Sequence, residues 1–135
     1  MSSNENKVHL AIIPDGNRRW AKSRSLLPWK GHEKSAENFS TITEWAGKRG
    51  NISVLTIWCL STENWKRDPH EIDELLKLLH NHLLGERKRL KDQHIHLIRS
   101  GRTDRIPASL LKLVDDISEE TKESPRMKLH LALDY

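Results

Sequence analysis

The chain has 135 residues and a formal net charge of +4 at pH 7, so it fits one domain with a buried core and favours anionic partners such as phosphates, nucleic acid or a lipid surface. Its only cysteine, Cys59, excludes an internal disulfide and indicates a reducing compartment. No apolar run approaches the roughly 20 residues of a membrane span, and the polar segment 1–7 is unlike a secretion signal, so we expect a cytoplasmic protein.

Four short apolar runs predict β-strands. They cover residues 8–13, 52–60, 95–98 and 129–133. Because the runs are continuous rather than alternating, they favour strands that are buried on both sides, as in parallel sheets.

The segments between these runs have helical periodicity. A helix is expected to open at residues 17–22, and three longer ones are predicted over residues 33–49, 71–90 and 106–123, with Gly50 as a cap. Strands that alternate with helices predict an α/β domain with a mainly parallel sheet and helices packed on its faces.

Polar segments follow the first three strands. D-G-N-R-R-W comes after the first, S-T-E-N-W-K-R after the second and S-G-R-T-D-R after the third. In a parallel sheet the carboxyl ends of the strands share one edge, which is where open α/β sheets bind ligands. We therefore expect two acids, Asp15 and Glu63, to meet several arginines there, Arg102 among them.

The first of these segments carries the clearest chemistry. An acid beside arginines can be a plain surface ion pair. However, Gly16 lets the backbone approach a ligand, and Arg18 and Arg19 can chelate phosphate oxygens. Asp15 is explained if a hard cation such as Mg²⁺ bridges it to those oxygens. The segment thus predicts a magnesium–diphosphate site.

Other aromatic and histidine side chains leave alternatives open. Trp20, Trp29 and Trp65 fit either ordinary packing or an apolar wall beside the phosphates. His32 is either a phosphate donor or a histidine without a special task. The pair at positions 94 and 96 lacks a third ligand at a convincing spacing, which disfavours a histidine metal site.

Several of these motifs occur together in one known family. H-L-A-I-I-P-D-G-N-R-R-W-A-K at 9–22, G-H at 31–32, L-T-I-W-C-L-S-T-E-N-W-K-R at 55–67 and L-H-L-A-L-D-Y at 129–135 resemble the cis-prenyltransferases of the undecaprenyl diphosphate synthase type. The resemblance implies the cis-prenyltransferase fold and a Mg²⁺-dependent transferase. Such an enzyme condenses isopentenyl diphosphate onto an allylic diphosphate, such as farnesyl diphosphate, to make a polyprenyl diphosphate that can serve as a cell wall lipid carrier.

The resemblance also assigns residues. Asp15 would be the catalytic carboxylate and Mg²⁺ contact, and Asn64 the proton acceptor or its positioning group. The substrate-binding residues would be Gly16, Asn17, Arg18, Arg19, Trp20, His32, Ser61, Thr62, Glu63, Trp65 and Arg67, several of them on a mobile loop. The leucine face of segment 71–90 would line a tunnel for the growing chain or simply pack the core.

The sequence departs from the family pattern in three places. Pro14 replaces a common methionine, and Pro28 stands where many members carry a phosphate-binding arginine, for which Arg24 or Lys30 could substitute. The chain also stops at Tyr135, where the family continues with G-G-R and a later R-x-x-G-E-x-R-x-S region that grips isopentenyl diphosphate and forms most of the dimer interface. We therefore expect residues 1–135 to be one truncated domain that binds allylic diphosphate weakly and does not elongate it.

The partners implied are the two diphosphates, a second copy of the full-length form, and at most peripheral membrane contact through the product. Nucleic acid is not expected, although a nucleic-acid-binding module is the alternative that the charge permits. A phosphohydrolase with an aspartyl nucleophile would want a second carboxylate that D-G-N-R does not offer. A non-catalytic prenyltransferase subunit is disfavoured by the intact D-G-N-x-R-W block.

Overall fold

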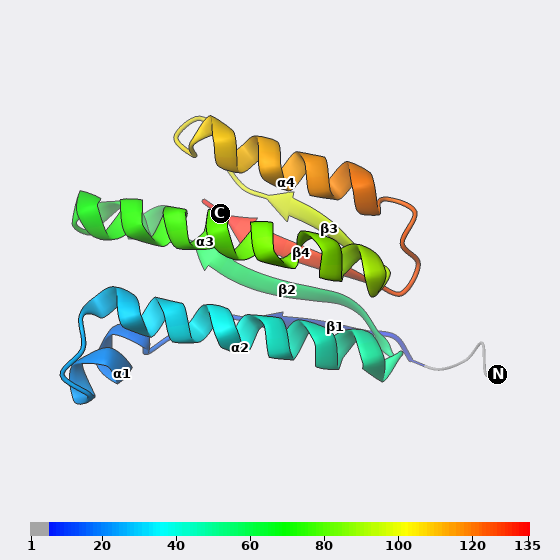
Figure 1. The fold of residues 1–135 in the computed structure, drawn as a ribbon, viewed down its shortest axis with the longest axis horizontal. Coiled ribbons are helices and arrows are strands. Elements are labelled where there is room, and N and C mark those ends of the chain that lie inside the picture. Colours follow the sequence, from blue (N-terminus) through cyan, green and yellow to red (C-terminus); the bar gives the residue numbers. More distant parts are fainter. Residues whose placement is uncertain (1–5) are drawn as a thin grey trace.

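The fold alternates strands and helices, as predicted (Figure 1). The computed structural model describes residues 6–135, so part of the polar segment 1–7 lies outside the described residues. The elements follow in the order β1 (Val8–Ile12), α1 (Asn17–Ser23), α2 (Pro28–Arg49), β2 (Ile52–Leu60), the 3₁₀-helix η1 (Thr62–Lys66), α3 (Pro69–Asp92), β3 (Ile95–Ser100), α4 (Ala108–Thr121) and β4 (Met127–Leu133).

The prolines explain where the helices differ from the prediction. Helix α2 begins at Pro28, five residues before its predicted start, because a proline in the first turn gives up an N–H that has no helical partner anyway. Pro107 lies just outside α4 as its N-cap residue. Gly50 ends α2 with a left-handed φ of 80°, which confirms the predicted cap. Among residues 6–135, no helix combines the length and apolar character that a bilayer crossing requires.

All four strands are parallel and lie in the order β1-β2-β4-β3, which confirms the predicted parallel sheet. The central strands carry the core: Leu55 on β2 pairs with Leu129 on β4, and both are fully buried. Leu97 of β3 is also fully buried, and its backbone N–H donates to Thr121 of α4 at 3.0 Å. Helix α4 thus protects the edge of β3.

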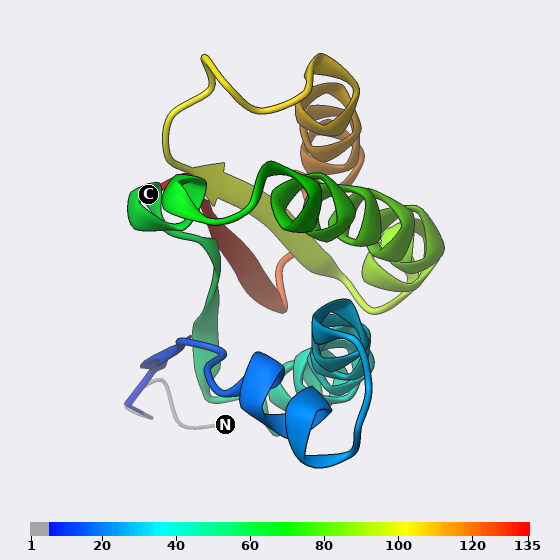
Figure 2. The same cartoon turned by 90° about the vertical axis from the view of Figure 1, so that its left-hand side faces the viewer.

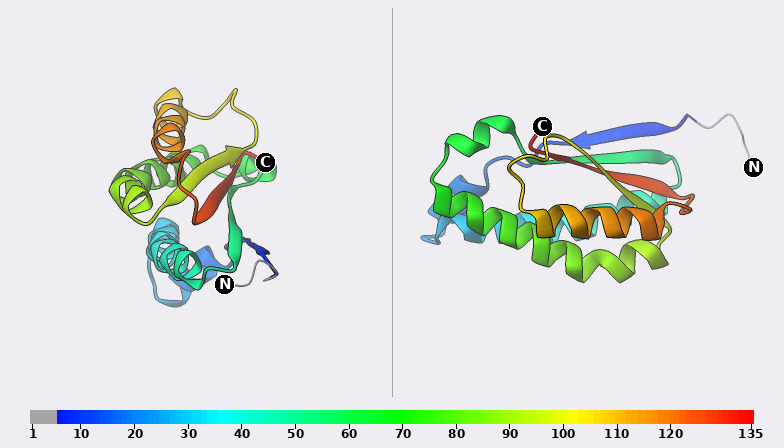
Figure 3. Two further views of the ribbon diagram at one scale, coloured as in Figure 1. Left: turned by 90° about the vertical axis from the view of Figure 1, so that its right-hand side faces the viewer. Right: turned by 90° about the horizontal axis from the view of Figure 1, so that it is seen from above.

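The helices do not cover both faces of the sheet, contrary to the prediction. Figures 2 and 3 show α2 and α3 on one face and α4 beside β3, while the opposite face carries no α-helix within residues 6–135. Strand β1 is an edge strand, and its residues are half-buried or exposed. Val8 at its start is 42% exposed, and Ile13, directly after its last residue, is 66% exposed. The expectation that this first run is buried on both sides is therefore wrong, because a continuous apolar run does not reveal how many faces are covered.

The uncovered face carries a polar row that crosses all four strands. Thr56 Oγ1 lies 2.6 Å from Nε2 of His9 and 3.0 Å from Nδ1 of His130. Nε2 of His130 then lies 2.7 Å from the hydroxyl of Ser100. Partial burial lowers the pKa of His130, with a smaller contribution from the charge of His9. On this face, side-chain hydrogen bonds thus link neighbouring strands in addition to their backbone pairing.

Candidate active site

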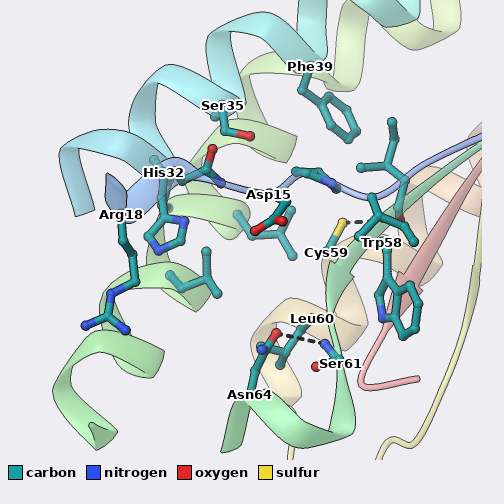
Figure 4. Close-up of a pocket in the computed structure, with 18 of the residues that line it drawn as sticks. Asp15, Arg18, His32, Ser35, Phe39, Trp58, Cys59, Leu60, Ser61 and Asn64 are labelled. Carbon is teal, nitrogen blue, oxygen red and sulfur yellow. Dashed lines mark hydrogen bonds between the residues drawn. The ribbon is translucent and has the colours of Figure 1, made fainter. Parts of the chain in front are cut away.

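The carboxyl ends of β1 and β2 and the first turns of α1, α2 and α3 gather at one end of the molecule (Figure 2). A cavity of about 660 Å³ opens there (Figure 4). Nine of the thirteen site residues predicted from the sequence line it: Asp15, Gly16, Asn17, Arg18, Arg19, His32, Ser61, Asn64 and Arg67. Two segments more than 40 positions apart in the sequence therefore meet in one pocket.

Asp15 stands at the open edge of this pocket. Gly16 takes a left-handed φ of 83°, and its N–H donates to Oδ1 of Asp15 at 2.7 Å. Oδ2 of the same carboxylate lies 3.5 Å from a guanidinium nitrogen of Arg19, and both side chains are about four-fifths exposed. The glycine turn thus holds the carboxylate at the start of α1, where its oxygens remain accessible to a ligand.

Helix α1 packs closely against α2 at a glycine of α2. A Cβ atom at Gly31 would lie 1.9 Å from the backbone oxygen of Asn17, so only glycine permits this approach. The close contact brings the first turn of α1, which carries Arg18 and Arg19, next to His32. In the G-H dipeptide, the glycine thus permits the close packing of α1 on α2, and the histidine lines the pocket.

A buried carboxylate that the sequence analysis missed lies at the centre of the cationic groups. Oε1 of Glu71 is 3.4 Å from Arg18, 3.6 Å from Nε2 of His32 and 3.8 Å from Arg67. The Glu71 side chain is only 10% exposed, whereas those of Arg18 and Arg67 are 55% and 35% exposed. Glu71 thus holds three donors at the pocket wall. Arg67 precedes α3, so the sequence offered no helical i,i+4 pattern that would have selected Glu71.

His32 is neutral at physiological pH. Burial lowers its pKa, and the carboxylate of Glu71 offsets this only in part. Nε2 of His32 and Oε1 of Glu71 have no partner within hydrogen-bond distance among the described residues, but the two buried atoms lie 3.6 Å from each other. They therefore face each other rather than an unfilled place for a ligand.

Asn64 is fixed by the turn that carries it. Segment 62–66 forms η1, in which the side chain of Ser61 and that of Asn64 cap each other's backbone. Oδ1 of Asn64 accepts the Ser61 N–H at 2.9 Å, as the dashed line in Figure 4 marks. With its oxygen engaged, the amide group offers its NH₂ donors to the pocket.

Behind the polar rim the pocket becomes apolar. Its wall between α2, α3 and β2 includes Phe39, Ile57, Leu75 and Leu79. Cys59 also lines the pocket, half-buried, and desolvation raises the pKa of its thiol to about 12, so it stays protonated. Part of the leucine face of α3 lines the cavity and part of it packs the core, so the tunnel for a growing chain stays a prediction.

Four predicted residues do not line the pocket. Thr62 and Glu63 are exposed, and Glu63 pairs with Lys66 at 3.3 Å. Trp20 stacks under Arg24 at 4.4 Å, and Trp65 packs against the core. The roles that the resemblance assigns to these four residues in substrate binding therefore stay predictions, since none of the four lines the cavity.

The third polar segment does not join the site. Arg102 chelates the carboxylate of Asp104 at 3.0 and 2.7 Å and does not line the pocket. The strand order explains this, because β4 lies between β2 and β3 and carries the third segment away from β1. Pro28 stands where many family members carry an arginine. Arg24 and Lys30, the two residues that could substitute for it, do not line the cavity.

The carboxylates of the pocket suit only one kind of magnesium site. Within the described part of the chain, no three His, Cys, Asp or Glu side chains are grouped closely enough to hold a metal ion. Magnesium, however, is often held by one or two carboxylates together with substrate phosphates and water. The accessible carboxylate of Asp15 beside arginines suits that arrangement and not an all-protein cage.

The chain is similar in sequence to known proteins. The family model described as putative undecaprenyl diphosphate synthase matches residues 13–135. The chain is 41% identical to dehydrodolichyl diphosphate synthase 2 of Arabidopsis thaliana and 39% identical to an isoprenyl transferase of Rhodopirellula baltica, each over 94% of the chain. It covers 41% and 52% of these relatives, so the chain spans about half the length of the curated relatives it matches.

Solved structures share the fold. Lavandulyl diphosphate synthase from Lavandula x intermedia, in complex with dimethylallyl diphosphate, matches with a TM-score of 0.88 and 33% identity, covering 94% of this chain and 54% of that one. A probable undecaprenyl diphosphate synthase from Campylobacter jejuni matches with a TM-score of 0.75 and 24% identity, covering 100% and 56%. The second similarity supports the fold alone.

Proposed function

Because the chain belongs to the prenyltransferase family described as putative undecaprenyl diphosphate synthase, we propose that its pocket binds the allylic diphosphate used in cis-prenyl chain elongation. The observation that carries the proposal is the pairing of a cationic rim with an apolar interior in one cavity. A diphosphate bearing a hydrocarbon tail needs both, and few other ligand classes do.

The rim residues would bind the diphosphate. Arg18 and Arg67 both line the pocket, and each has a guanidinium nitrogen within 4 Å of Oε1 of Glu71. Neutral His32 and the NH₂ group of Asn64 add hydrogen-bond donors or acceptors without further charge. When the allylic C–O bond breaks, negative charge grows on the leaving diphosphate, and preformed donors stabilise this transition state more than the ground state.

Asp15 is the residue that would hold Mg²⁺, and Arg19 would keep its carboxylate in place. The chemistry that Mg²⁺ would supply there is neutralisation of the charge on the leaving diphosphate. This assignment is supported by the accessible carboxylate and by the family to which the chain belongs.

The apolar wall would take the tail. Burying each CH₂ group is worth about 0.8 kcal/mol, so even a short prenyl tail adds several kcal/mol to binding. Phe39, Leu75 and Leu79 lie on the cavity wall where such a tail would pack. The neutral thiol of Cys59 is compatible with that environment.

Chain elongation by the longer relatives also requires isopentenyl diphosphate. We propose that the groups that bind it, and a homodimer interface, belong to the half of the relatives that this chain does not match. The 135-residue chain should then bind the allylic substrate weakly and not extend it.

Calorimetry with farnesyl diphosphate tests the proposal. We expect binding that requires Mg²⁺, is abolished by EDTA and is lost in Asp15→Asn. Asp92→Asn, which removes an exposed carboxylate at the end of α3, is the matched control and should bind normally. Magnesium-independent binding, or equal affinity in Asp15→Asn, would refute the assignment of Asp15. Rapid incorporation of labelled isopentenyl diphosphate would refute the expected lack of elongation.

A further inference from the structure

A second feature of the same end of the molecule is an exposed apolar turn in a strongly basic segment. Helix α1 ends at Ser23 and α2 begins at Pro28, and the turn between them projects at one end of the molecule (Figure 1). Two adjacent leucines occupy its tip, with Leu26 43% and Leu27 55% exposed. Exposed neighbouring leucines are unfavourable in water unless another surface covers them.

The turn is ordered despite its exposure. The N–H of Leu26 donates to Ala21 O at 2.9 Å, and the N–H of Lys30 donates to Leu27 O at 2.9 Å. Ser25 between the helices takes a left-handed φ of 55°. The two leucines are therefore presented by a defined backbone rather than by a loose loop.

Cationic side chains predominate around the leucines, although Arg18, Arg19 and Lys30 each lie within 4 Å of a carboxylate, those of Glu71, Asp15 and Glu33. Residues 16–30 contain five cationic side chains and no carboxylate: Arg18, Arg19, Lys22, Arg24 and Lys30. Outside the main pocket, a shallow cavity of about 420 Å³ combines Arg19 and Lys22 with Leu26. Cations around an aliphatic tip match an anionic lipid surface, where headgroups pair with the cations and the leucines enter the acyl boundary.

We propose that the α1–α2 turn, residues 24–27, together with Lys22 in the last turn of α1, docks this protein onto membranes that contain anionic phospholipids. Leu26 and Leu27 insert at the interface, and Lys22 and Arg24 contact headgroup phosphates. Arg18 and Arg19 line both the shallow cavity and the main pocket, so docking places the mouth of the pocket beside the bilayer. The value of that placement for an apolar product rests on the proposed function, but the docking itself does not.

Vesicle flotation of the 135-residue chain tests the docking. We expect binding to phosphatidylcholine vesicles that contain phosphatidylglycerol, little binding to pure phosphatidylcholine, and weaker binding as salt is raised. The double variant L26S/L27S should reduce the partition coefficient about tenfold or more. Leu84→Ser, at a leucine of α3 that is 48% exposed, is the matched control and should bind like the wild type.

A second pair of variants separates local charge from net charge. Lys22→Gln with Arg24→Gln lowers the net charge from +4 to +2, and so does Lys77→Gln with Lys88→Gln on α3. Only the first pair should weaken vesicle binding, again by about tenfold. All variants alter exposed side chains, and circular dichroism would verify their fold.

Several results would overturn the docking proposal. They are an absence of vesicle binding, equal binding of L26S/L27S and wild type, equal binding to neutral and anionic vesicles, or equal loss in the two charge pairs. Binding of RNA through the same turn without any binding to vesicles would replace the lipid surface with a different partner. Because farnesyl diphosphate binding is measured separately, failure of docking is distinguishable from failure of the proposed function.

Discussion

Replacing Gly31 by alanine should loosen the active site without touching any side chain in it. The added Cβ would lie 1.9 Å from Asn17 O, whereas carbon and oxygen atoms in close contact stay about 3.3 Å apart. Helix α1 must therefore move away from α2 by about 1.4 Å or more. The clashing oxygen belongs to the backbone of Asn17, the first residue of α1, so no side-chain rotation can relieve the clash.

The expected magnitude follows from two opposing effects. Alanine gains about 0.5–1 kcal/mol over glycine inside a helix, while overpacking costs about 1–3 kcal/mol. At Gly85 of α3 a Cβ meets nothing within 4 Å, so Gly85→Ala should receive the gain alone. Urea denaturation should thus rank the free energy of unfolding as Gly85→Ala above wild type and wild type above Gly31→Ala.

Ligand binding separates this idea from a simple loss of stability. A shift of this size displaces Arg18 from the pocket, so calorimetry under conditions where Gly31→Ala remains folded should find farnesyl diphosphate affinity reduced about tenfold or more. Gly85→Ala should keep wild-type affinity. If both variants matched the wild type in affinity and Gly31→Ala matched it in stability, the close approach of α1 and α2 would not be what organises the site.

Two further predictions concern ionisable groups. Asp134→Asn removes the charge that chelates Arg105 at 2.7 Å through both oxygens, and it should lower the thermal midpoint by a few degrees while the left-handed backbone, which asparagine tolerates, is kept; an unchanged midpoint would contradict this. Burial lowers the pKa of His32, His82 and His130, so the unfolded chain binds more protons below its histidine pKa near 6.5. The free energy of unfolding should fall from about pH 6.5 to about pH 5, before carboxylates titrate, and a flat profile in urea titrations would contradict the lowered values.

Much of the fold could be predicted because the relevant signals are local. The alternation of apolar runs and helical periodicity located every strand and long helix, and Gly50 marked the end of α2. What local patterns do not contain is the number of layers. The run at 8–13 reads like a buried strand, but β1 lies at an edge with one helical layer against the sheet.

The site was predictable to the extent that consecutive strands are also neighbours. The segments after β1 and β2 meet because those strands pair directly, and they supply Asp15, Arg18 and Asn64 to one cavity. The segment after β3 was assigned to the same place by the same rule. It fails because strand order is not chain order, so Arg102 pairs locally with Asp104.

Glu71 illustrates what a motif search leaves out. An acid among arginines that are predicted to bind phosphate looks unfavourable for an anion site, so neither composition nor motif selects it. In the folded protein, however, it lies within 4 Å of three cationic or polar donors and keeps two guanidinium groups from repelling each other in a half-buried wall. Under the proposed function, a diphosphate entering the pocket would meet donors that Glu71 already orients, and its negative charge would replace part of the interaction that Glu71 provides. Binding would then be an exchange of partners rather than a simple neutralisation, with the site ordered before the substrate arrives.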